Sequence, residues 1–598
     1  MELLGQNRNH VMQTSQLIRV FHPVQSVTKA FGNGLIGSIV IASLMVSSVV
    51  HAQEDSGDTL IPILSEELSR IWEVVSTGDE PAHWLNLSVI DRRVLETQAT
   101  HGASSAISEY HTRLADIDIR VGSPELDNTH KIRDAGWFSE EPRPVIDMPV
   151  HEQRPLPIRM AIWRAADTAY RSAVRRLIKV RTNEAVKVDR EDSSADFSHA
   201  ESVVDLGPIE PLAIDGPYWK DTVERLSEVF VEYSSVYDSN VTFRVQQDVH
   251  YIQNSEGTNI RFQRNRVRLS MWAATIADDG MELQVADYID TIHPDRLPDI
   301  DTLLEQAHHM GARLSDLRNA PLVEPYAGPA ILRGRAAAVF FHEILGHRVE
   351  GHRQKDEDEG QTLTDKIDEQ IFPRFISVRD DPTVSRWQDV DLNGAYPYDD
   401  EGVVAQPVSI VDRGVFRNFL MSRSPIEGFS QSNGHGRRQP GSAVVARQGN
   451  LIVEADNSVP YRDLRAQLIG EIRRQGKPFG LIFDDITGGF TFTGRSTPNS
   501  YSVKPVTVWR VYADGRPDEL VRGVDMIGTP LTTFSRILAA SDTYQVFNGM
   551  CGAESGWVPV SAIAPDLLIE EVEIQRKEKG NDRPPLLPAP TPSVEGGS

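Results

Sequence analysis

The chain has 598 residues, a formal net charge of -25 and one cysteine. This length allows at least two domains, each with a large core. The acidic excess argues against nucleic acid as a direct partner, because phosphate binding needs clustered Lys and Arg. A single cysteine excludes a disulfide within the chain.

A mostly apolar run near the N-terminus, Leu35–Val50, follows three scattered basic residues. It is short for a membrane span, and the small side chains of Val50 and Ala52 suit the two recognition positions of a signal-peptide cleavage site. We therefore expect a signal peptide over residues 1–52, cleaved after Ala52, and a periplasmic or secreted protein. The long leading region leaves two alternatives open, an uncleaved membrane anchor and an internal start at Met12. Contact with a membrane is expected only through this segment, if it stays uncleaved.

Several helices are expected in the first half of the mature chain. Apolar residues recur at three- and four-residue steps over Ile61–Val75, which predicts an amphipathic helix. Further helices are expected over Ile162–Val180, Tyr218–Tyr233 and Asp301–Leu317. The basic side chains of Ile162–Val180 are interpreted as a solvated face. The polar, poorly periodic stretch 186–217 is expected to be a loop or linker.

Alternating apolar and polar residues predict an antiparallel sheet in the same half. Val241–Val249 and Asn259–Ala274 are expected to pair through a turn at residues 254–257, and Met281–Tyr288 continues the sheet. Helices on an antiparallel sheet predict an N-terminal α+β domain over residues 53–325.

Residues 342–347 read His-Glu-Ile-Leu-Gly-His and follow an apolar, helical run. Two neutral imidazoles can hold a zinc ion, and a neighbouring glutamate can take a proton from a metal-activated water. On a regular helix, however, positions i and i+5 point about 140° apart. We therefore predict a local π-bulge that brings His342 and His347 together, with Gly346 loosening the backbone. The alternative is two ordinary surface histidines beside Glu343.

The single cysteine, Cys551, lies far downstream between Gly549 and Gly552. The two glycines predict a tight loop in which the backbone closely approaches another group. A thiolate on a loop suits zinc as a third ligand, whereas the alternative is a small buried apolar residue. His352 repeats the five-residue spacing after His347 and is expected to face solvent or to support the ligands.

Residues 326–576 are expected to form a C-terminal domain that carries the metal helix. Short strands separated by Gly- and Asp-rich turns predict a β-rich, barrel-like or sandwich domain, so the whole chain is expected to be α+β. Tyr461–Gln475 is expected to be a helix, and the Pro-rich tail 577–598 is expected to be disordered. The expected strands are Val403–Val411, Val415–Met421, Asn450–Glu454, Gly480–Asp484, Phe490–Thr493, Val503–Tyr512 and Leu520–Met526.

Several sequence blocks in this half resemble the TldD/PmbA family of bacterial metalloproteases, and specifically its catalytic TldD-type member. The resemblance covers about residues 325–575 and depends on the order of the blocks. The similar blocks are Phe341–His347 with Val349-Glu350-Gly351, Asp399-Asp400-Glu401-Gly402, residues 433–438, residues 485–492, residues 523–528 and the segment around Cys551. The stretches 439–442 and 446–450 match the family pattern only loosely.

The resemblance implies a zinc endopeptidase in an exported branch of the family. His342, His347 and Cys551 would hold Zn2+, and Glu343 would be the general base. The non-catalytic partner subunits of the family lack the His-Glu…His set, which this chain has. A further donor to the transition state would help such a site. The candidates for that donor and for substrate binding are His435, Arg437 and Arg438, with solvated basic residues in a glycine-rich loop as the alternative.

The resemblance also implies extended, unfolded peptides as substrates, bound as an added strand along a sheet edge. Relatives work as complexes of two similar subunits, so a homo- or hetero-oligomer with a related subunit is expected. Two other classes stay open. One is a family member that binds peptides without cutting them, and the other is a metal-dependent hydrolase of a non-peptide amide.

Overall fold

In the computed structural model of the chain, the part from Asp58 onward forms one compact unit. The predicted signal peptide and nearly all of the predicted disordered tail lie outside the described residues. In the described part, no helix is long and apolar enough to cross a membrane. The structure describes residues 58–132, 143, 145–150, 154–185, 192–355, 359–494, 501–528, 533–577 and 587.

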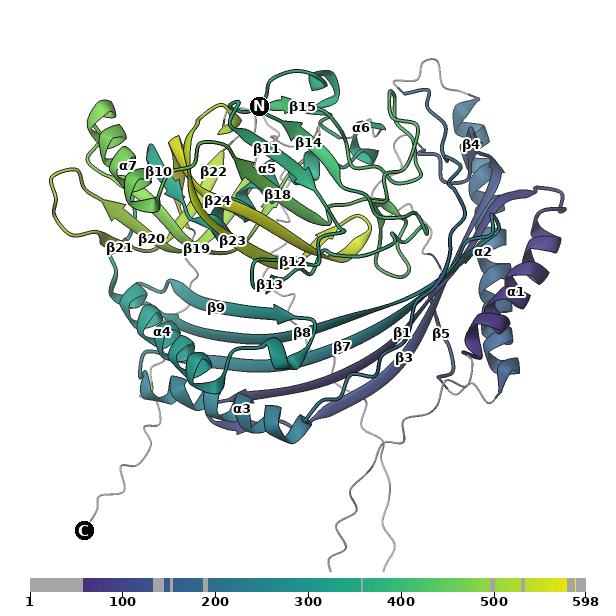
Figure 1. Cartoon of the computed structure of the whole chain (residues 1–598), viewed down its shortest axis with the longest axis horizontal. Helices are drawn as coiled ribbons and strands as arrows, with labels where there is room; N and C mark the ends of the chain where they lie inside the picture. Colours follow the sequence, from purple (N-terminus) through teal and green to yellow (C-terminus); the bar gives the residue numbers. More distant parts are fainter. Residues whose placement is uncertain are drawn as a thin grey trace, which may run out of the picture. The chain divides into compact units, whose positions relative to one another are not determined.

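Nine strands of the described chain form the first sheet. Their bounds are β1 Ala82–Thr100, β2 Ala103–Ser104, β3 Ser108–Ser123, β4 Leu126–Asp127, β5 Val145–Asp147, β6 Val204–Leu206, β7 Asp238–Asn254, β8 Asn259–Ile276 and β9 Glu282–Thr291. The order across the sheet is β4-β3-β1-β7-β8-β6, with β2 beside β1, β5 beside β3 and β9 beside β8. Figure 1 shows β9, β8, β7, β1 and β3 side by side. The predicted β7–β8 hairpin and its continuation in β9 are confirmed.

The outer face of this sheet is apolar and is covered by four helices. Leu87 and Ile117 pack under α1 and α2 at one end, while Phe243 and Leu269 pack under α3 and α4 at the other (Figure 1). The four predicted helices are confirmed, with α2 longer at both ends than expected. Their bounds are α1 Leu60–Val75, α2 Pro155–Glu184, α3 Gly216–Glu228, followed by a 3-10 turn Val229–Glu232, and α4 Ile300–Asn319.

The inner face of the first sheet is polar and is directed toward the second sheet. Side chains two residues apart on a strand lie on the same face. On β8, Arg264 donates to the backbone oxygen of Asn393 and Arg266 contacts Met550, both in the second half of the chain. The predicted loop 186–217 contains the short strand β6, which pairs in parallel with β8.

A second sheet of eleven strands is formed by the C-terminal half of the described chain. Its bounds are β10 Tyr326–Leu332, β11 Ile376–Asp380, β14 Val408–Asp412, β15 Val415–Phe416, β18 Asn450–Ala455, β19 Gly480–Thr491, β20 Tyr501–Val511, β21 Glu519–Val521, β22 Val524–Gly528, β23 Ile537–Ala553 and β24 Gly556–Arg576. β10 pairs with both β19 and β24, so β10-β19-β20-β22-β24 close into a ring. The predicted barrel-like character is therefore confirmed, and the chain is α+β.

Helix α5, Gly334–Ile344, is buried in the core of the second sheet and contacts β19, β23 and β24. Helix α7, Tyr461–Gln475, packs against a separate core that includes Ile331 and Leu568, and it ends at Gly476 in a left-handed conformation. The remaining short elements are α6 His352–Lys355, β12 Arg386–Trp387, β13 Val390–Asp391, β16 Gly436–Arg437, β17 Val445–Ala446 and the 3-10 turns Pro294–Arg296, Gly346–Arg348 and Thr364–Lys366.

Two predicted strands are much shorter in the structure than expected. The prediction over 403–411 is confirmed only from Val408, because Asp399 closes a turn by accepting from the backbone N–H groups of Glu401 and Val403. The prediction over 415–421 is confirmed only for Val415–Phe416. Beyond it the backbone follows other loops, and the Leu420 N–H donates to the carbonyl of Val349.

Candidate metal centre

The predicted π-bulge between the two histidines is wrong. Helix α5 ends at Ile344, and residues 346–348 form a tighter 3-10 turn in which the N–H of Val349 donates to the carbonyls of Leu345 and Gly346. The guanidinium of Arg348 donates to the carbonyls of Glu343 (2.8 Å) and Ile344 (3.2 Å), which satisfies the end of the helix. A change of winding, rather than a widened helix, brings the histidines together.

Gly346 is needed for close packing rather than for an unusual backbone angle. A Cβ atom at this position would lie 1.9 Å from Oε1 of Gln448. Gln448 is buried and comes from the segment between β17 and β18. A larger residue at position 346 would therefore have to displace this amide or the turn that carries His347.

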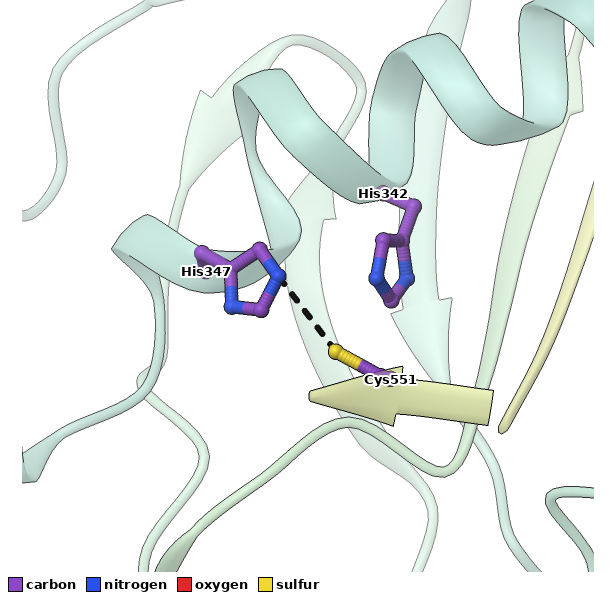
Figure 2. A group of neighbouring side chains, drawn as sticks. All are labelled: His342, His347 and Cys551. Carbon is purple, nitrogen blue, oxygen red and sulfur yellow. Dashed lines mark hydrogen bonds between the residues drawn. The ribbon is translucent and has the colours of Figure 1, made fainter. Parts of the chain in front are cut away.

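The structure brings His342, His347 and Cys551 together, as Figure 2 shows. Their candidate ligand atoms all lie within 4.8 Å of one another. The Nε2 atom of His347 is 3.4 Å from the Cys551 sulfur, and the two imidazole rings are 5.0 Å apart between centroids. All three residues are buried, which excludes the alternative of ordinary surface histidines.

Cys551 lies on a strand, and the predicted tight loop around it is wrong. It belongs to β23, opposite Val558 of β24, and the hairpin turns only after Ala553. The two flanking glycines make room for aromatic rings instead. A Cβ at Gly549 would come within 2.7 Å of the Phe547 ring, and one at Gly552 within 3.0 Å of the Trp557 ring.

The electrostatics of the three side chains favour a thiolate. Burial alone would raise the pKa of Cys551, but His347, His342 and Arg447 hold it well below its usual range. Burial alone would lower the pKa of His342, but the Cys551 thiolate raises it. The same thiolate, together with Glu350, raises the pKa of His347 well above its ordinary value. A metal ion bound here would replace the protons on the two imidazoles.

Glu343 lies next to the three side chains and is also buried. Desolvation by burial raises the pKa of its carboxyl, although His342 and His347 oppose the shift. Strand β19 approaches this side chain closely, since a Cβ at Gly489 would lie 2.7 Å from Cγ of Glu343. The carboxylate is therefore confined between α5 and β19.

The residues present fit a metal ion with a nearby water. Buried side-chain atoms without a hydrogen-bond partner gather around the three side chains, including Nδ1 of His342, Oε2 of Glu343 and both amide atoms of Gln448. Such atoms are uncommon in folded proteins, and a bound ion or water is one of their usual partners. Two imidazoles and one thiolate are a ligand set that suits a tetrahedral divalent ion with one open position.

The carboxylate of Glu350 contacts the ring nitrogen of His347 that does not face Cys551. The sequence did not indicate a functional role for Glu350. Its carboxylate lies 3.2 Å from Nδ1 of His347, 2.9 Å from Nε of Arg353 and 3.3 Å from Nε of Arg447. Burial alone would raise the pKa of Glu350, but His347 and Arg353 lower it to about 2. A carboxylate on the second ring nitrogen directs the first toward a metal.

A second group of possible ligands, Glu350, His352 and Glu554, is occupied by ion pairs instead. Arg353 lies between the two glutamates and donates to both, at 2.9 Å and 3.0 Å. His352 pairs with Glu554. Through Arg353 and Glu350 this pair is connected with His347, which agrees with the expectation that His352 supports the ligands.

The three predicted substrate-binding residues are buried and bonded within the chain. His435 contacts Asn433 and Asp380 through its two ring nitrogens. Arg437 donates to backbone oxygens at 2.5 Å and 2.7 Å, and Arg438 pairs with Asp116 of β3 at 3.1 Å. The alternative of solvated basic residues is wrong for both arginines. A substrate-binding role for the three stays a prediction.

Comparison with known proteins finds similarity to metallopeptidases over part of the chain. Residues 326–576 match the PmbA/TldA metallopeptidase C-terminal domain. The chain is 26% identical over 272 residues to a metalloprotease of Archaeoglobus fulgidus, covering 45% of this chain and 58% of that relative. It is 23% identical over 361 residues to a metalloprotease of Methanocaldococcus jannaschii, covering 60% of this chain and 72% of the relative. The C-terminal half of the chain is therefore similar to a metallopeptidase domain, and the chain spans only about three fifths of the length of the first of these relatives.

A solved structure shows the same fold. TldE from Thermococcus kodakarensis superimposes with a TM-score of 0.55 at 16% sequence identity, covering 86% of this chain and 100% of the other. At this identity the similarity describes the fold alone. The α+β arrangement of two sheets with their helices is therefore a fold shared with that protein.

Proposed function

We propose that this chain, with a C-terminal half that matches a metallopeptidase domain, is a zinc-dependent endopeptidase of the catalytic TldD type. The observation that carries the proposal is the meeting of His342, His347 and Cys551 beside a buried glutamate. In this proposal the three side chains hold Zn2+ and Glu343 is the general base. A zinc ion there would supply a Lewis acid that polarises the scissile carbonyl and acidifies water.

Glu343 has the position and environment for proton transfer. It would take a proton from the attacking water and deliver it to the leaving amine. Because burial raises the pKa of this carboxyl, it binds a proton more strongly than an exposed glutamate would. Gly489 keeps the facing strand close, so the carboxylate has little freedom to turn away.

We propose that an extended peptide binds along the outer edge of β23. Pro559 lies opposite Met550 and has no N–H, so this is a non-hydrogen-bonded pair, and the N–H and C=O of Met550 point away from β24. Arg437 accordingly reaches the Pro559 carbonyl from the far side, at 2.7 Å. Among the described residues, β23 forms a ladder with β24, and a further isolated bridge joins Ser541 of β23 to Val459, ten residues before Cys551. An added strand there would pass directly beside Cys551.

We further propose an exported protein that works with a related subunit. The apolar segment Leu35–Val50 supports a signal peptide cleaved after Ala52 and a periplasmic or secreted location. The fold similarity to TldE supports a partnership with another family member, either a second copy of this chain or a separate subunit. The predicted domains, 53–325 and 326–576, remain part of the proposal.

The proposal is tested with an unfolded protein as substrate. The zinc-loaded mature chain is incubated with a reduced, unfolded polypeptide and with the same polypeptide in its folded state. We expect internal cleavage of the unfolded form, its loss after treatment with a chelator, and its return when zinc is added. A fully metal-loaded chain that cleaves neither form would contradict the proposal.

A further inference from the structure

Most of the charged side chains on the inner face of the first sheet are paired. Arg92 of β1 makes a two-pronged contact with Asp248 of β7, at 2.7 Å and 2.8 Å. Arg268 of β8 does the same with Asp290 of β9, at 2.7 Å and 2.9 Å. At the far end of the face, Arg244 pairs with Glu96. Each of these cations has its own carboxylate.

Arg264 and Arg266 break this pattern. They lie two residues apart on β8, between the paired arginines, and neither has a carboxylate partner among the described residues. Arg264 donates to the backbone oxygen of Asn393 at 3.0 Å, and Arg266 lies 3.1 Å from the sulfur of Met550. These contacts use one N–H each, whereas a guanidinium has five N–H donors.

The surroundings of both guanidinium groups disfavour their positive charge. Both side chains are half-buried. Desolvation, together with the nearby Arg437 and Arg266 cations, lowers the pKa of Arg264 to about 10, against the pull of Asp248 and Asp400. Desolvation also lowers the pKa of Arg266, against the pull of Asp248. Arg264 and Arg266 are thus two adjacent cations whose charge is only partly neutralised, in a chain with a net charge of -25. Such a pair is typical of a site that binds an anion.

The position of the arginine pair connects it with the proposed substrate edge. Arg266 contacts Met550, the residue directly before Cys551 on β23. Side chains alternate between the two faces of a strand, so Met550 points toward the first sheet while Cys551 points toward the histidines. A peptide strand added to the edge of β23 would likewise send every second side chain toward Arg264 and Arg266.

We infer that Arg264 and Arg266 form a subsite that binds a carboxylate of the peptide, so that peptides with a carboxylate at this subsite are the preferred substrates. This inference rests on the proposed function and deepens it. A planar guanidinium matches a carboxylate with two parallel hydrogen bonds, which gives selectivity as well as affinity. The carboxylate can belong to an Asp or Glu side chain or to the C-terminus of the peptide.

The test is a binding measurement that does not depend on cleavage. Four fluorescent peptides of one sequence carry Glu or Gln at a single position and a free or amidated C-terminus. Their dissociation constants are measured with the zinc-loaded Glu343→Gln chain. We expect about tenfold or more loss of affinity when the recognised carboxylate is neutralised. Loss with Gln identifies a side-chain carboxylate, and loss with the amide identifies the C-terminus.

Variants show whether the two arginines cause the preference. Arg264→Gln and Arg266→Gln should each bring the affinity ratio of acidic to neutral peptide toward one, while Arg266→Lys should keep part of it. Arg266→Glu should reverse the preference toward a matched Lys peptide. Arg244→Gln is the control, because it removes a cation from the same face that already has a partner, and the ratio should stay as in the parent chain.

Two outcomes would overturn the inference. One is equal affinity for all four peptides, and the other is a preference that survives both glutamine substitutions. Cleavage of the same peptides by the chain with Glu343 intact is scored separately. Preferential binding without cleavage would contradict the proposed peptidase and support the subsite. Cleavage of all four peptides at equal rates would support the peptidase and contradict the subsite.

Discussion

The carboxylate of Glu350 lies 3.2 Å from Nδ1 of His347, and the opposite ring nitrogen of the same histidine lies 3.4 Å from the Cys551 sulfur. One hydrogen bond therefore sets which nitrogen faces the candidate metal site. Glu350 is in turn held by Arg353 and Arg447. The ligand geometry depends on a buried carboxylate that is held from two directions.

Replacing Glu350 by Gln should weaken metal binding without removing a ligand. The amide keeps the size of the side chain but loses the charge that orients His347, so we expect a fall of about 10- to 100-fold in zinc affinity. Competition with a chromophoric chelator measures the affinity. Glu554→Gln is the matched control, since Glu554 pairs with His352 and Arg353 in the same network. Equal affinity for the Glu350→Gln and parent chains would contradict the assignment.

Replacing Glu343 by Gln should abolish cleavage while the metal stays bound. The amide cannot accept the proton of the attacking water, and general-base catalysis contributes about 10²- to 10⁴-fold in rate. The measurement combines the rate constant for cleavage of an unfolded peptide with the zinc content of the same sample. A variant that retains both metal and full activity would exclude Glu343 as the base.

Replacing Gly346 by Ala should disturb the site through packing alone. The new Cβ would lie 1.9 Å from Oε1 of Gln448, so this amide or the turn that carries His347 must shift, and we expect weaker zinc binding. The double variant Gly346→Ala/Gln448→Ala removes the clash and should recover most of the lost affinity. If the single variant binds zinc as well as the parent chain, the close approach of Gln448 does not position His347.

Part of the site could be predicted from the sequence because its chemistry lies in rare residues. Two histidines and a glutamate within six residues indicated that α5 carries metal ligands. Cys551, as the single cysteine, was the candidate for the third ligand. Glu350 and Arg447 were not identified as a pair because nearly one hundred residues separate them. Their contact depends on how the segment after α5 packs against the segment before β18, which no local pattern reveals.

The fold was predictable where one face of an element is buried and the other is not. The alternation in β7 and β8 and the helical spacing in α1 gave correct elements. The long strands β1 and β24 were missed because both of their faces are largely buried, so their sequences lack a clear alternation. The π-bulge was wrong because side-chain spacing alone does not distinguish a widened helix from one that ends in a 3-10 turn.

Stability should fall in mild acid because of His250 on the inner face of the first sheet. Burial lowers its pKa to about 3, whereas the unfolded chain takes up a proton near pH 6.5. Below that pH the unfolded state binds more protons, so the free energy of unfolding decreases, by up to about 1.4 kcal/mol per pH unit for this group. Urea unfolding of the parent chain and of His250→Gln at pH 7 and pH 5 measures the difference.

The substitution at position 250 should make the unfolding midpoint less dependent on pH. His309→Gln, at an exposed position on α4, is the control for the loss of one histidine from the chain. The same loss of stability in the parent chain and in His250→Gln between pH 7 and pH 5 would exclude His250 as its source.

The most direct test of the account is the metal content and metal spectrum of the purified mature chain, compared with those of Cys551→Ser. We predict about one zinc ion per chain, and a thiolate-to-metal charge-transfer band when cobalt replaces zinc. In the serine variant the band should be absent and the metal weakly held. Full metal retention in that variant, or a cobalt-loaded parent chain without the band, would contradict the site formed by His342, His347 and Cys551.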